Sequence, residues 1–363
     1  MHLVKYFNKK KVLITGNSGF KGKWLSLFLK ELNCEVYGVS LNETTKTHGF
    51  DKFQGKIKHQ YELNITDFVE LKQVFEELKP EIVFHLAANA ITNNSFEDPL
   101  GTISTNVMGT AHVLECLRIL DNPCVAIMVT SDKCYENQEW VWGYRENDRI
   151  GGKDPYSASK GMSELLISSY YQSFFKNQTK IKIASCRAGN VIGGGDFGLM
   201  RIVPDCFRAW SNRLPIDIRN PESTRPWNYV LDVLYGYLLT AYSIDLKNLN
   251  GESFNFGPDS NSEVTVLQLV VELWKYWEDN SFTPYVLGEN TNTNHEHKYL
   301  KLNKDKANRL LNWNPQMTID KALKETADWY QEYLTKPENI EFYSIQLVRN
   351  YMEGLKLIDE SSD

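Results

Sequence analysis

Two groups of side chains that could move protons lie in the segment 129–160. Tyr156 and Lys160 are four positions apart and follow Pro155 directly. Proline is favoured at the first position of a helix, so we expect a helix here, with the phenol and the ammonium about one turn apart on one face. A nearby ammonium lowers the pKa of a tyrosine, which could then take a proton from a hydroxyl group. The same spacing also fits an ordinary helix face.

The second group is Ser131-Asp132-Lys133, which follows the apolar run 125–129. A lysine that loses its proton and a carboxylic acid that keeps one would form an acid–base pair, and burial shifts both pKa values in those directions. The two groups could instead share one proton, or form a surface turn with a weak ion pair. The rest of the chain decides between these interpretations.

The first half of the chain alternates expected strands with expected helices. The strands are 11–15, 35–41, 61–65, 82–88 and 125–129, and the helices are 23–32, 68–78 and 98–120. This order predicts an α/β fold with a doubly wound parallel sheet and helices on both faces. Ligands of such sheets bind beyond the carboxyl ends of the strands, and most of the candidate polar residues lie at such an end.

A glycine-rich turn separates the first strand from the first long helix. Gly16, Gly19 and Gly22 are three positions apart, and Ser18 and Phe20 lie between them. Glycines let the backbone turn sharply and approach a pyrophosphate, which the N-terminus of the following helix stabilises. We therefore expect these five residues to bind a dinucleotide cofactor.

Further cofactor contacts are expected where later strands end, at Ser40, Asn64, Ile65, Leu86, Ala87 and Ala88. Asn106, inside the expected helix 98–120, is expected to contact the cofactor as well. The second strand does not end in the acid that often holds the adenosine ribose, so Ser40 or Asn42 would take that place, and the lack of an arginine there favours NAD over NADP. Asn64 could hydrogen-bond an adenine edge. The small residues 86–88 would let a flat cofactor lie against the backbone, or serve tight packing alone.

Size and composition narrow the class of protein. The chain has 363 residues, 42% of them hydrophobic and 24% charged, as in a globular protein with a sizeable core. A formal charge of −6 argues against a nucleic-acid partner. Neither a membrane-spanning apolar run nor the apolar segment of a signal peptide is visible, so a cytoplasmic location is expected. The six scattered cysteines are expected to be reduced, and no metal site is expected.

Several motifs resemble a known family. The glycine turn, segments 85–88 and 105–107, and Tyr156-x-x-x-Lys160 together resemble the extended short-chain dehydrogenase/reductases. Within that family the sequence is similar to the CDP-glucose 4,6-dehydratases over about residues 9–335, most closely in segments 19–22, 130–137, 142–146, 187–196 and 225–227. Lys133 is the most specific match, since dehydratases of other nucleotide sugars usually carry glutamate there. The sequence departs from the pattern at Asn17, Asn93, Asn94 and Phe197.

The resemblance implies an NAD-dependent enzyme that converts a nucleotide-linked hexose, first of all CDP-glucose, to its 4-keto-6-deoxy product. It implies that Tyr156, supported by Lys160, is the base at the C4 hydroxyl and that Ser131 holds the 4-oxygen. Lys133 would be the base at C5 and Asp132 the acid at C6. NAD would be regenerated and stay bound. The alternatives are a 4-epimerase or 4-reductase acting on another nucleotide sugar, which needs no acid–base pair at C5 and C6, and a sensor that binds a dinucleotide without catalysis.

The second half is expected to hold the nucleotide sugar. We expect a dinucleotide-binding domain over 1–186 to which 227–257 return, a smaller substrate domain over 187–335 and a C-terminal tail over 336–363. Guanidinium groups match phosphate oxygens in pairs, although each arginine also fits a surface position. The expected substrate contacts are Asn94, Ser131, Asn190, Arg208, Arg219, Arg225 and Tyr299, with His295 as an alternative to Tyr299. The resemblance also implies a homodimer through the helices that begin near Pro99 and Pro155.

Overall fold

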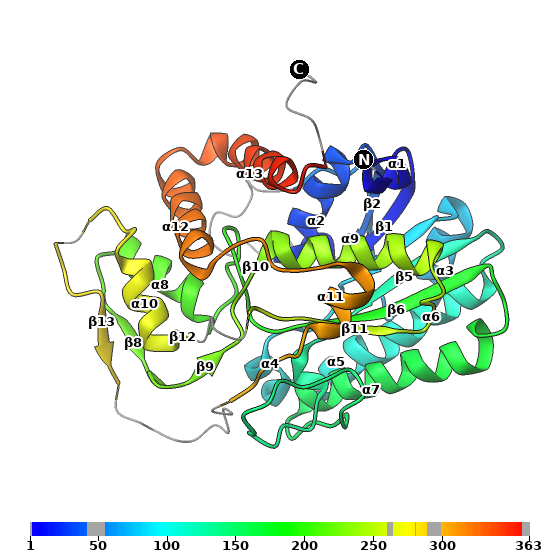
Figure 1. Cartoon of the computed structure of the whole chain (residues 1–363), viewed down its shortest axis with the longest axis horizontal. Helices are drawn as coiled ribbons and strands as arrows, with labels where there is room; N and C mark the ends of the chain where they lie inside the picture. The colour runs from blue at the N-terminus through cyan, green and yellow to red at the C-terminus, as the bar shows by residue number, and fades with distance from the viewer. Residues whose placement is uncertain (1, 42–54, 260–263, 280, 289–298, 358–363) are drawn as a thin grey trace.

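The computed structural model describes residues 2–41, 55–259, 264–279, 281–288 and 299–357. Its centre is a seven-stranded parallel sheet in the order β11-β6-β5-β4-β1-β2-β3 (Figure 1). These strands are β1 Lys11–Thr15, β2 Glu35–Ser40, β3 His59–Glu62, β4 Ile82–His85, β5 Cys124–Val129, β6 Ile181–Ala188 and β11 Ser253–Phe256. The predicted doubly wound α/β fold is confirmed, and the order reverses at β1, where such sheets bind their ligands.

Helices cover both faces of the sheet (Figure 1). One face packs against α2 Phe20–Glu31 and α9 Val230–Leu246, and the other against α3 Phe68–Leu78, α6 Gly109–Ile119 and α7 Pro155–Tyr170. Successive side chains of a strand point to opposite faces, so Val12 and Ile14 of β1 join the first core and Leu13 joins the second. Both faces of the sheet are therefore buried, as parallel strands require.

Side chains at the expected positions begin the helices that flank the site. Asp154 accepts a hydrogen bond from the Ser157 amide, and Pro155 takes the first position of α7, as predicted. Asp67 caps α3 in the same way through the Glu70 amide. The expected helix 98–120 is found as α5 Pro99–Ile103 and α6, joined by one π-helical turn, Ser104–Met108.

A second group of elements lies beside the carboxyl ends of the strands, on the left of Figure 1. It comprises β7 Val191–Ile192, α8 Ile202–Ser211, β8 Ile216–Ile218, β9 Thr224–Arg225, β10 Asn228–Tyr229, β12 Val264–Thr265, α10 Val266–Trp274, β13 Tyr285–Leu287 and α12 Ile319–Thr335. Between these elements the chain returns to the sheet, since β11 pairs with β6 and α9 packs on the sheet. The boundaries expected for two domains remain a prediction.

The remaining elements complete the surface. They are α1 His2–Phe7, α4 Thr92–Glu97, α11 Asp305–Leu311 and α13 Ile340–Gly354. The C-terminal segment includes α13, which packs against α2 and α12. Within the described ranges, no helix combines the length and apolar character needed to cross a lipid bilayer.

Candidate active site

The glycine turn is packed too tightly for larger residues. Gly16 has a φ of 76°, and a Cβ there would lie 2.7 Å from the Ala87 Cα. A Cβ on Gly22 would lie 2.2 Å from the Gly16 carbonyl oxygen, whereas one on Gly19 would meet that oxygen at an ordinary 3.4 Å. Gly19 is also the N-cap of α2. The turn thus places backbone amides of a helix N-terminus beside the end of β1, which suits a pyrophosphate.

An amide network lies next to the glycine turn, over the ends of β2 and β3. The Asn17 Nδ2 donates to the Gln60 Oε1 at 2.6 Å, and the Gln60 Nε2 donates to the Ser40 hydroxyl at 3.0 Å. Asn17 fits there because Gly38 has no side chain. The sequence analysis missed Gln60, because β3 begins at His59 and not at the expected residue 61. Asn42, the alternative to Ser40, lies outside the described residues.

The other expected cofactor residues line the ends of β3 and β4. The Asn64 side-chain oxygen accepts a hydrogen bond from the Thr66 amide at 3.0 Å, which forms a local turn. Ile65 is buried, and it is the side chain that a Cβ on Gly109 would meet. Leu86, Ala87 and Ala88 are half-buried, and Ala87 forms the wall against which Gly16 turns. Phe20 begins α2, and Ser18 is half-buried just before it.

Asn106 is used within the protein. Its amide nitrogen donates to the Asn89 carbonyl at 3.0 Å and to the Ser159 hydroxyl at 2.8 Å, and its oxygen accepts from the Asn89 amide at 2.8 Å. Both amide hydrogens are therefore occupied, and Asn106 joins the segment after β4 to α7. The structure shows Asn106 holding the segment after β4 against α7. A contact with the cofactor remains a prediction.

The two groups of proton-moving residues meet where β5 ends. Ser131 precedes a 3-10 turn over Asp132–Cys134, and its hydroxyl accepts from the Lys133 amide at 3.2 Å and donates to the Asp132 Oδ1 at 2.9 Å. The Ser131 hydroxyl also lies near the Tyr156 phenol, close enough to lower its pKa. The segment after β5 and the start of α7 thus form one cluster, as expected from the sequence.

Asp132 is buried in this cluster. It is 3% exposed, and its Oδ2 has no hydrogen-bond partner among the described residues. Burial raises the pKa of Asp132, and the charge of Lys133, the hydrogen bond from Ser131 and the charge of Arg225 oppose that rise. The net direction favours a protonated carboxyl, as an acid at this position would need. Because the charge of Arg225 lowers the pKa of Asp132, Arg225, a predicted substrate residue, lies near Asp132.

Tyr156 and Lys160 are both buried on the inner face of α7. Burial raises the pKa of Tyr156 to about 12, against the hydrogen bond with Ser131 and the charge of Arg201. Burial lowers the pKa of Lys160 to about 8. The prediction that the pKa of Tyr156 is lowered is therefore wrong for this structure, because loss of solvation outweighs every nearby positive charge.

Two cations of the site were missed by the sequence analysis. Lys21, in the first turn of α2, lies 3.3 Å from the Tyr237 hydroxyl. Burial lowers the pKa of Lys21 to about 8, assisted by the charges of Lys160 and Arg201, so all three cations lie near one another. Arg201 pairs with Asp196 at 2.9 Å. Lys21 stands between two motif glycines, which is a weak signal, and nothing in the spacing indicates Arg201.

The predicted substrate residues differ in how free their side chains are. Arg208 donates to the Phe197 and Gly198 carbonyls and pairs with Asp205, so it holds the loop before α8. Arg219 is exposed just beyond β8.

Three further predicted substrate residues lie on the segments around the site. Asn94 is exposed on α4, next to Ser95, whose hydroxyl accepts from the Tyr156 amide at 3.2 Å. Asn190 is half-buried before β7. The Tyr299 carbonyl accepts from the Asn137 amide nitrogen at 2.9 Å. His295 lies outside the described residues.

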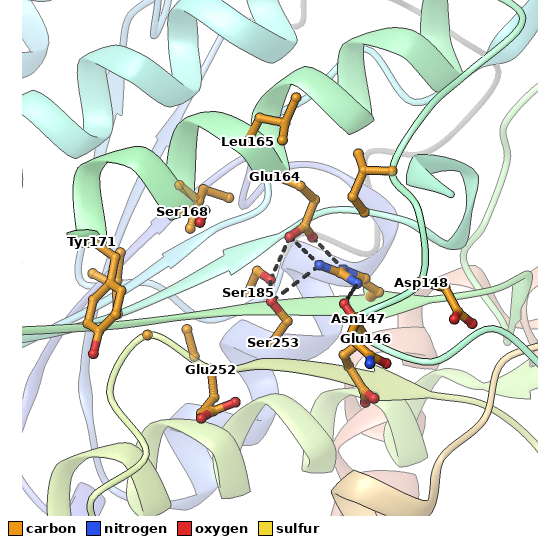
Figure 2. Close-up of a pocket in the computed structure, with 16 residues that line it drawn as sticks. Glu146, Asn147, Asp148, Glu164, Leu165, Ser168, Tyr171, Ser185, Glu252 and Ser253 are labelled. Carbon is orange, nitrogen blue, oxygen red and sulfur yellow. Dashed lines mark hydrogen bonds and ion pairs between the residues drawn. The ribbon is translucent and has the colours of Figure 1, made fainter. Parts of the chain in front are cut away.

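A separate cavity of about 270 Å³ lies between α7 and the sheet (Figure 2). Its lining comes from α7, β6, β11 and the segment 146–148, and includes the ion pair of Glu164 with Arg187. Tyr156 and Lys160 are not among the lining residues, so this cavity is not the reaction site. Within the described part of the chain, no three His, Cys, Asp or Glu side chains are grouped so that they could hold a metal ion.

Comparison with known proteins gives the family. Residues 13–326 match the family described as GDP-mannose 4,6 dehydratase. A CDP-glucose 4,6-dehydratase of Salmonella typhimurium strain LT2 is 40% identical over 355 residues, 96% of this chain and 98% of that protein. A UDP-glucuronate 4-epimerase of Thermodesulfobacterium geofontis is 26% identical, over 88% of this chain and 96% of that protein.

Solved structures share the fold. An epimerase from Methanothermobacter thermautotrophicus superposes with a TM-score of 0.79 at 23% identity, covering 96% of this chain and 97% of that one. A dTDP-glucose 4,6-dehydratase from Bacillus anthracis, solved in complex with NAD, gives 0.70 at 19% identity, covering 90% and 97%. The chain is therefore an enzyme of the nucleotide-sugar 4,6-dehydratase family, within the extended short-chain dehydrogenase/reductases.

Proposed function

We propose that this enzyme uses bound NAD to convert CDP-glucose to CDP-4-keto-6-deoxyglucose with loss of water. The observation that carries the proposal is the position of Ser131, which hydrogen-bonds Asp132 and lies near Tyr156, because it joins the groups needed at C4 to the groups needed at C5 and C6. The name of the relative that is 40% identical supports the choice of CDP-glucose.

The residues beyond β1 and β2 fit NAD. Gly16 and Gly22 are packed too tightly to carry a side chain, whereas Gly19 has room beside it. The backbone amides at the N-terminus of α2 could therefore bind the pyrophosphate. Gln60, held by Asn17 and Ser40, would meet the adenosine ribose, and no charged group of this network favours a 2′-phosphate. Lys160 would hydrogen-bond the nicotinamide ribose. When bound, NAD supplies a hydride acceptor for C4 and a hydride donor for C6.

The first role of the protein is at the C4 hydroxyl. Tyr156 takes the hydroxyl proton as the hydride leaves C4, and Ser131, which lies near Tyr156, holds the resulting 4-oxygen. Burial raises the pKa of Tyr156 to about 12 and so disfavours the phenolate that this step needs, whereas the charge of Arg201 and the nearby Ser131 hydroxyl favour it. A C4 ketone is left on the sugar.

The second role of the protein is at C5 and C6. The ketone acidifies the C5 proton, which Lys133 takes, and the electron pair of that bond forms the C5–C6 double bond. The C6–O bond breaks as Asp132 gives its proton to the leaving hydroxyl, which departs as water. Burial raises the pKa of Asp132, which is the direction that an acid at this position needs. After hydride returns to C6, Lys133 gives its proton back to C5.

The second group of elements would hold the nucleotide. Arg225 lies near Asp132 and is the best supported phosphate ligand. Asn190, Arg219, Tyr299 and Asn94 lie on the surrounding segments and are proposed to contact the sugar or the nucleotide. Arg208 is proposed to position the loop before α8 and not to bind substrate directly, because its guanidinium is already used. This assignment treats residues 187–335 as the substrate domain.

We also propose a homodimer in the cytoplasm. Exposed apolar side chains occur on the helices expected at the interface, with Phe96 57%, Leu100 78%, Met108 49% and Leu165 62% exposed. Such a surface suits a second copy of the chain. All six cysteines are buried and free, which suits a reducing compartment.

A substrate panel tests the proposal. The enzyme is incubated with CDP-glucose, dTDP-glucose, UDP-glucose or GDP-mannose, and the product is treated with base to develop the chromophore of a 4-keto sugar. CDP-glucose is expected to react fastest and to lose water. An epimer of the substrate formed without loss of water would support the 4-epimerase alternative and refute the dehydration.

A further inference from the structure

A buried ion pair joins α7 to β6 behind the catalytic cluster. Glu164 and Arg187 are 4% and 3% exposed. The Arg187 Nε donates to the Glu164 Oε1 at 2.8 Å and its Nη2 donates to the Oε2 at 2.7 Å, which is the two-pronged arrangement of a guanidinium and a carboxylate. Figure 2 shows Glu164 pointing from α7 toward Ser185 and Ser253 of the sheet. The pair forms part of the wall of the 270 Å³ cavity.

Each partner also binds the segment that carries the acid–base residues. The Thr130 hydroxyl donates to the Glu164 Oε1. The Arg187 Nη1 donates to the Tyr135 hydroxyl at 2.6 Å, and the guanidinium lies over the Tyr135 ring at 5.0 Å. Thr130 directly precedes Ser131, and Tyr135 directly follows the turn. The ion pair therefore holds both ends of the segment between them.

The same pair is fixed to the helix that carries the base. Glu164 follows Lys160 by four positions on α7, so both side chains lie on one face of the helix, one turn apart. Glu164 lies close enough to Lys160 for its charge to raise the pKa of that lysine. The ion pair thus links the position of Asp132 and Lys133 to the position of Tyr156 and Lys160.

Stability alone does not require this pair. Replacing a buried ion pair by apolar side chains of similar size is often neutral or stabilising, because the charges no longer lose their hydration. Unlike an apolar contact, the pair makes directional hydrogen bonds, and these fix the positions of Thr130 and Tyr135.

We propose that Glu164 and Arg187 are positioning residues that set the segment of Ser131, Asp132 and Lys133 against Tyr156 and Lys160, and so serve both the oxidation at C4 and the loss of water. This inference rests on the proposed function. It predicts that an apolar replacement of the pair leaves a folded enzyme in which both steps are slow. A shift of about 1 Å in a catalytic group can cost roughly 10²-fold in rate.

The test uses the full chain with NAD and the double variant Glu164→Leu/Arg187→Met, which keeps the net charge. The matched control is Lys182→Met/Asp245→Leu, which removes the ion pair at the other end of β6. Thermal unfolding measures folding. Nicotinamide absorbance in a single turnover of CDP-glucose measures oxidation, and the base-developed chromophore measures dehydration. A second substrate, CDP-6-deoxyglucose, lacks the leaving hydroxyl and reports oxidation alone.

The expected result is a folded double variant that reduces NAD and loses water more slowly than the parent, each step by up to about 10²-fold. The control variant should keep both rates. No loss of either step, or equal losses in the control variant, would overturn the inference. If the double variant does not fold, Arg187→Lys replaces it, because the charge stays while the fork that reaches Tyr135 is lost, and the same two outcomes apply. Failure of the parent enzyme to reduce NAD with CDP-glucose would instead refute the proposed function.

Discussion

The Ser131 hydroxyl lies close enough to the Tyr156 phenol to lower its pKa, although Ser131 follows strand β5 and Tyr156 lies in the first turn of helix α7. This contact brings a hydroxyl that also binds Asp132 into reach of the proposed C4 base. One sugar ring placed beside Tyr156 would therefore meet the acid of the elimination as well. Substitutions in this cluster should affect the two steps of the reaction differently.

Replacing Lys133 should separate oxidation from dehydration. Lys133→Ala removes the proposed C5 base and leaves Tyr156 and Lys160 in place, so NAD binding and the reduction of NAD by CDP-glucose should persist while the 4-keto-6-deoxy product is lost. Titration with NAD and the base-developed chromophore measure the two properties. Retention of most of the dehydration rate would remove Lys133 from the mechanism.

Replacing Tyr156 should slow the first step. Tyr156→Phe keeps the ring in its buried place and removes the hydroxyl, and a general base contributes roughly 10²–10⁴-fold to the rate. Single-turnover reduction of NAD by CDP-glucose should fall by that factor, with an unchanged unfolding temperature as the control for folding. A rate close to that of the parent enzyme would assign the base to another residue.

Replacing Asp132 should affect stability and activity in opposite directions. The folded-state pKa of Asp132 is raised, so the folded protein binds a proton more tightly than the unfolded chain and loses stability as pH rises through that window. Asp132→Asn should therefore raise the free energy of unfolding above the folded-state pKa of Asp132, with a gain that shrinks as pH falls through that pKa. Dehydration should be lost at every pH.

Denaturant unfolding at several pH values measures this effect. A gain that does not depend on pH would show that packing, and not the buried charge, causes it. A variant that dehydrates at the parent rate would exclude Asp132 as the acid.

His85 should make folding sensitive to acid. It lies between the Thr15 and Thr110 hydroxyls, at 2.7 and 3.0 Å, and burial lowers its pKa from 6.5 to about 3. Below pH 6.5 the unfolded chain takes up a proton that the folded protein excludes, so stability is lost as pH falls toward 3, by up to about 1.4 kcal/mol per pH unit.

His85→Gln should flatten that dependence, which denaturant unfolding between pH 4 and pH 8 can measure. His59→Gln, on the exposed side of β3, is the control for removing an imidazole. A slope that is the same in the parent and in His85→Gln would contradict the assignment.

Much of the sheet could be predicted from the sequence, because buried parallel strands read as apolar runs. The strands beginning at Lys11 and Glu35 and the helix beginning at Phe68 were predicted at or within a residue of their observed bounds. The glycine turn was visible because its function needs positions without a Cβ, as at Gly16 and Gly22. The spacing of residues along the chain is enough to indicate a local turn of this kind.

The contacts that depend on tertiary packing could not be predicted. Gln60 was missed because a polar strand at the sheet edge has no clear pattern, so β3 was placed too late. The charge of Arg201 acts on Tyr156 from a loop 45 positions further along the chain, and no sequence motif relates the two residues. The upward shift of the Tyr156 pKa was missed for the same reason, since burial depends on the packed structure and not on the distance to Lys160 along the helix.

The most direct test of the proposed reaction follows one hydrogen atom. CDP-glucose deuterated at C4 is converted by the enzyme in ordinary water, and the product is analysed by NMR and mass spectrometry. If oxidation at C4 and loss of water at C5 and C6 occur in one site, the product should carry the deuterium at C6 of the same molecule. Deuterium that remains at C4, or that is lost to solvent, would contradict the joining of the two groups around one sugar.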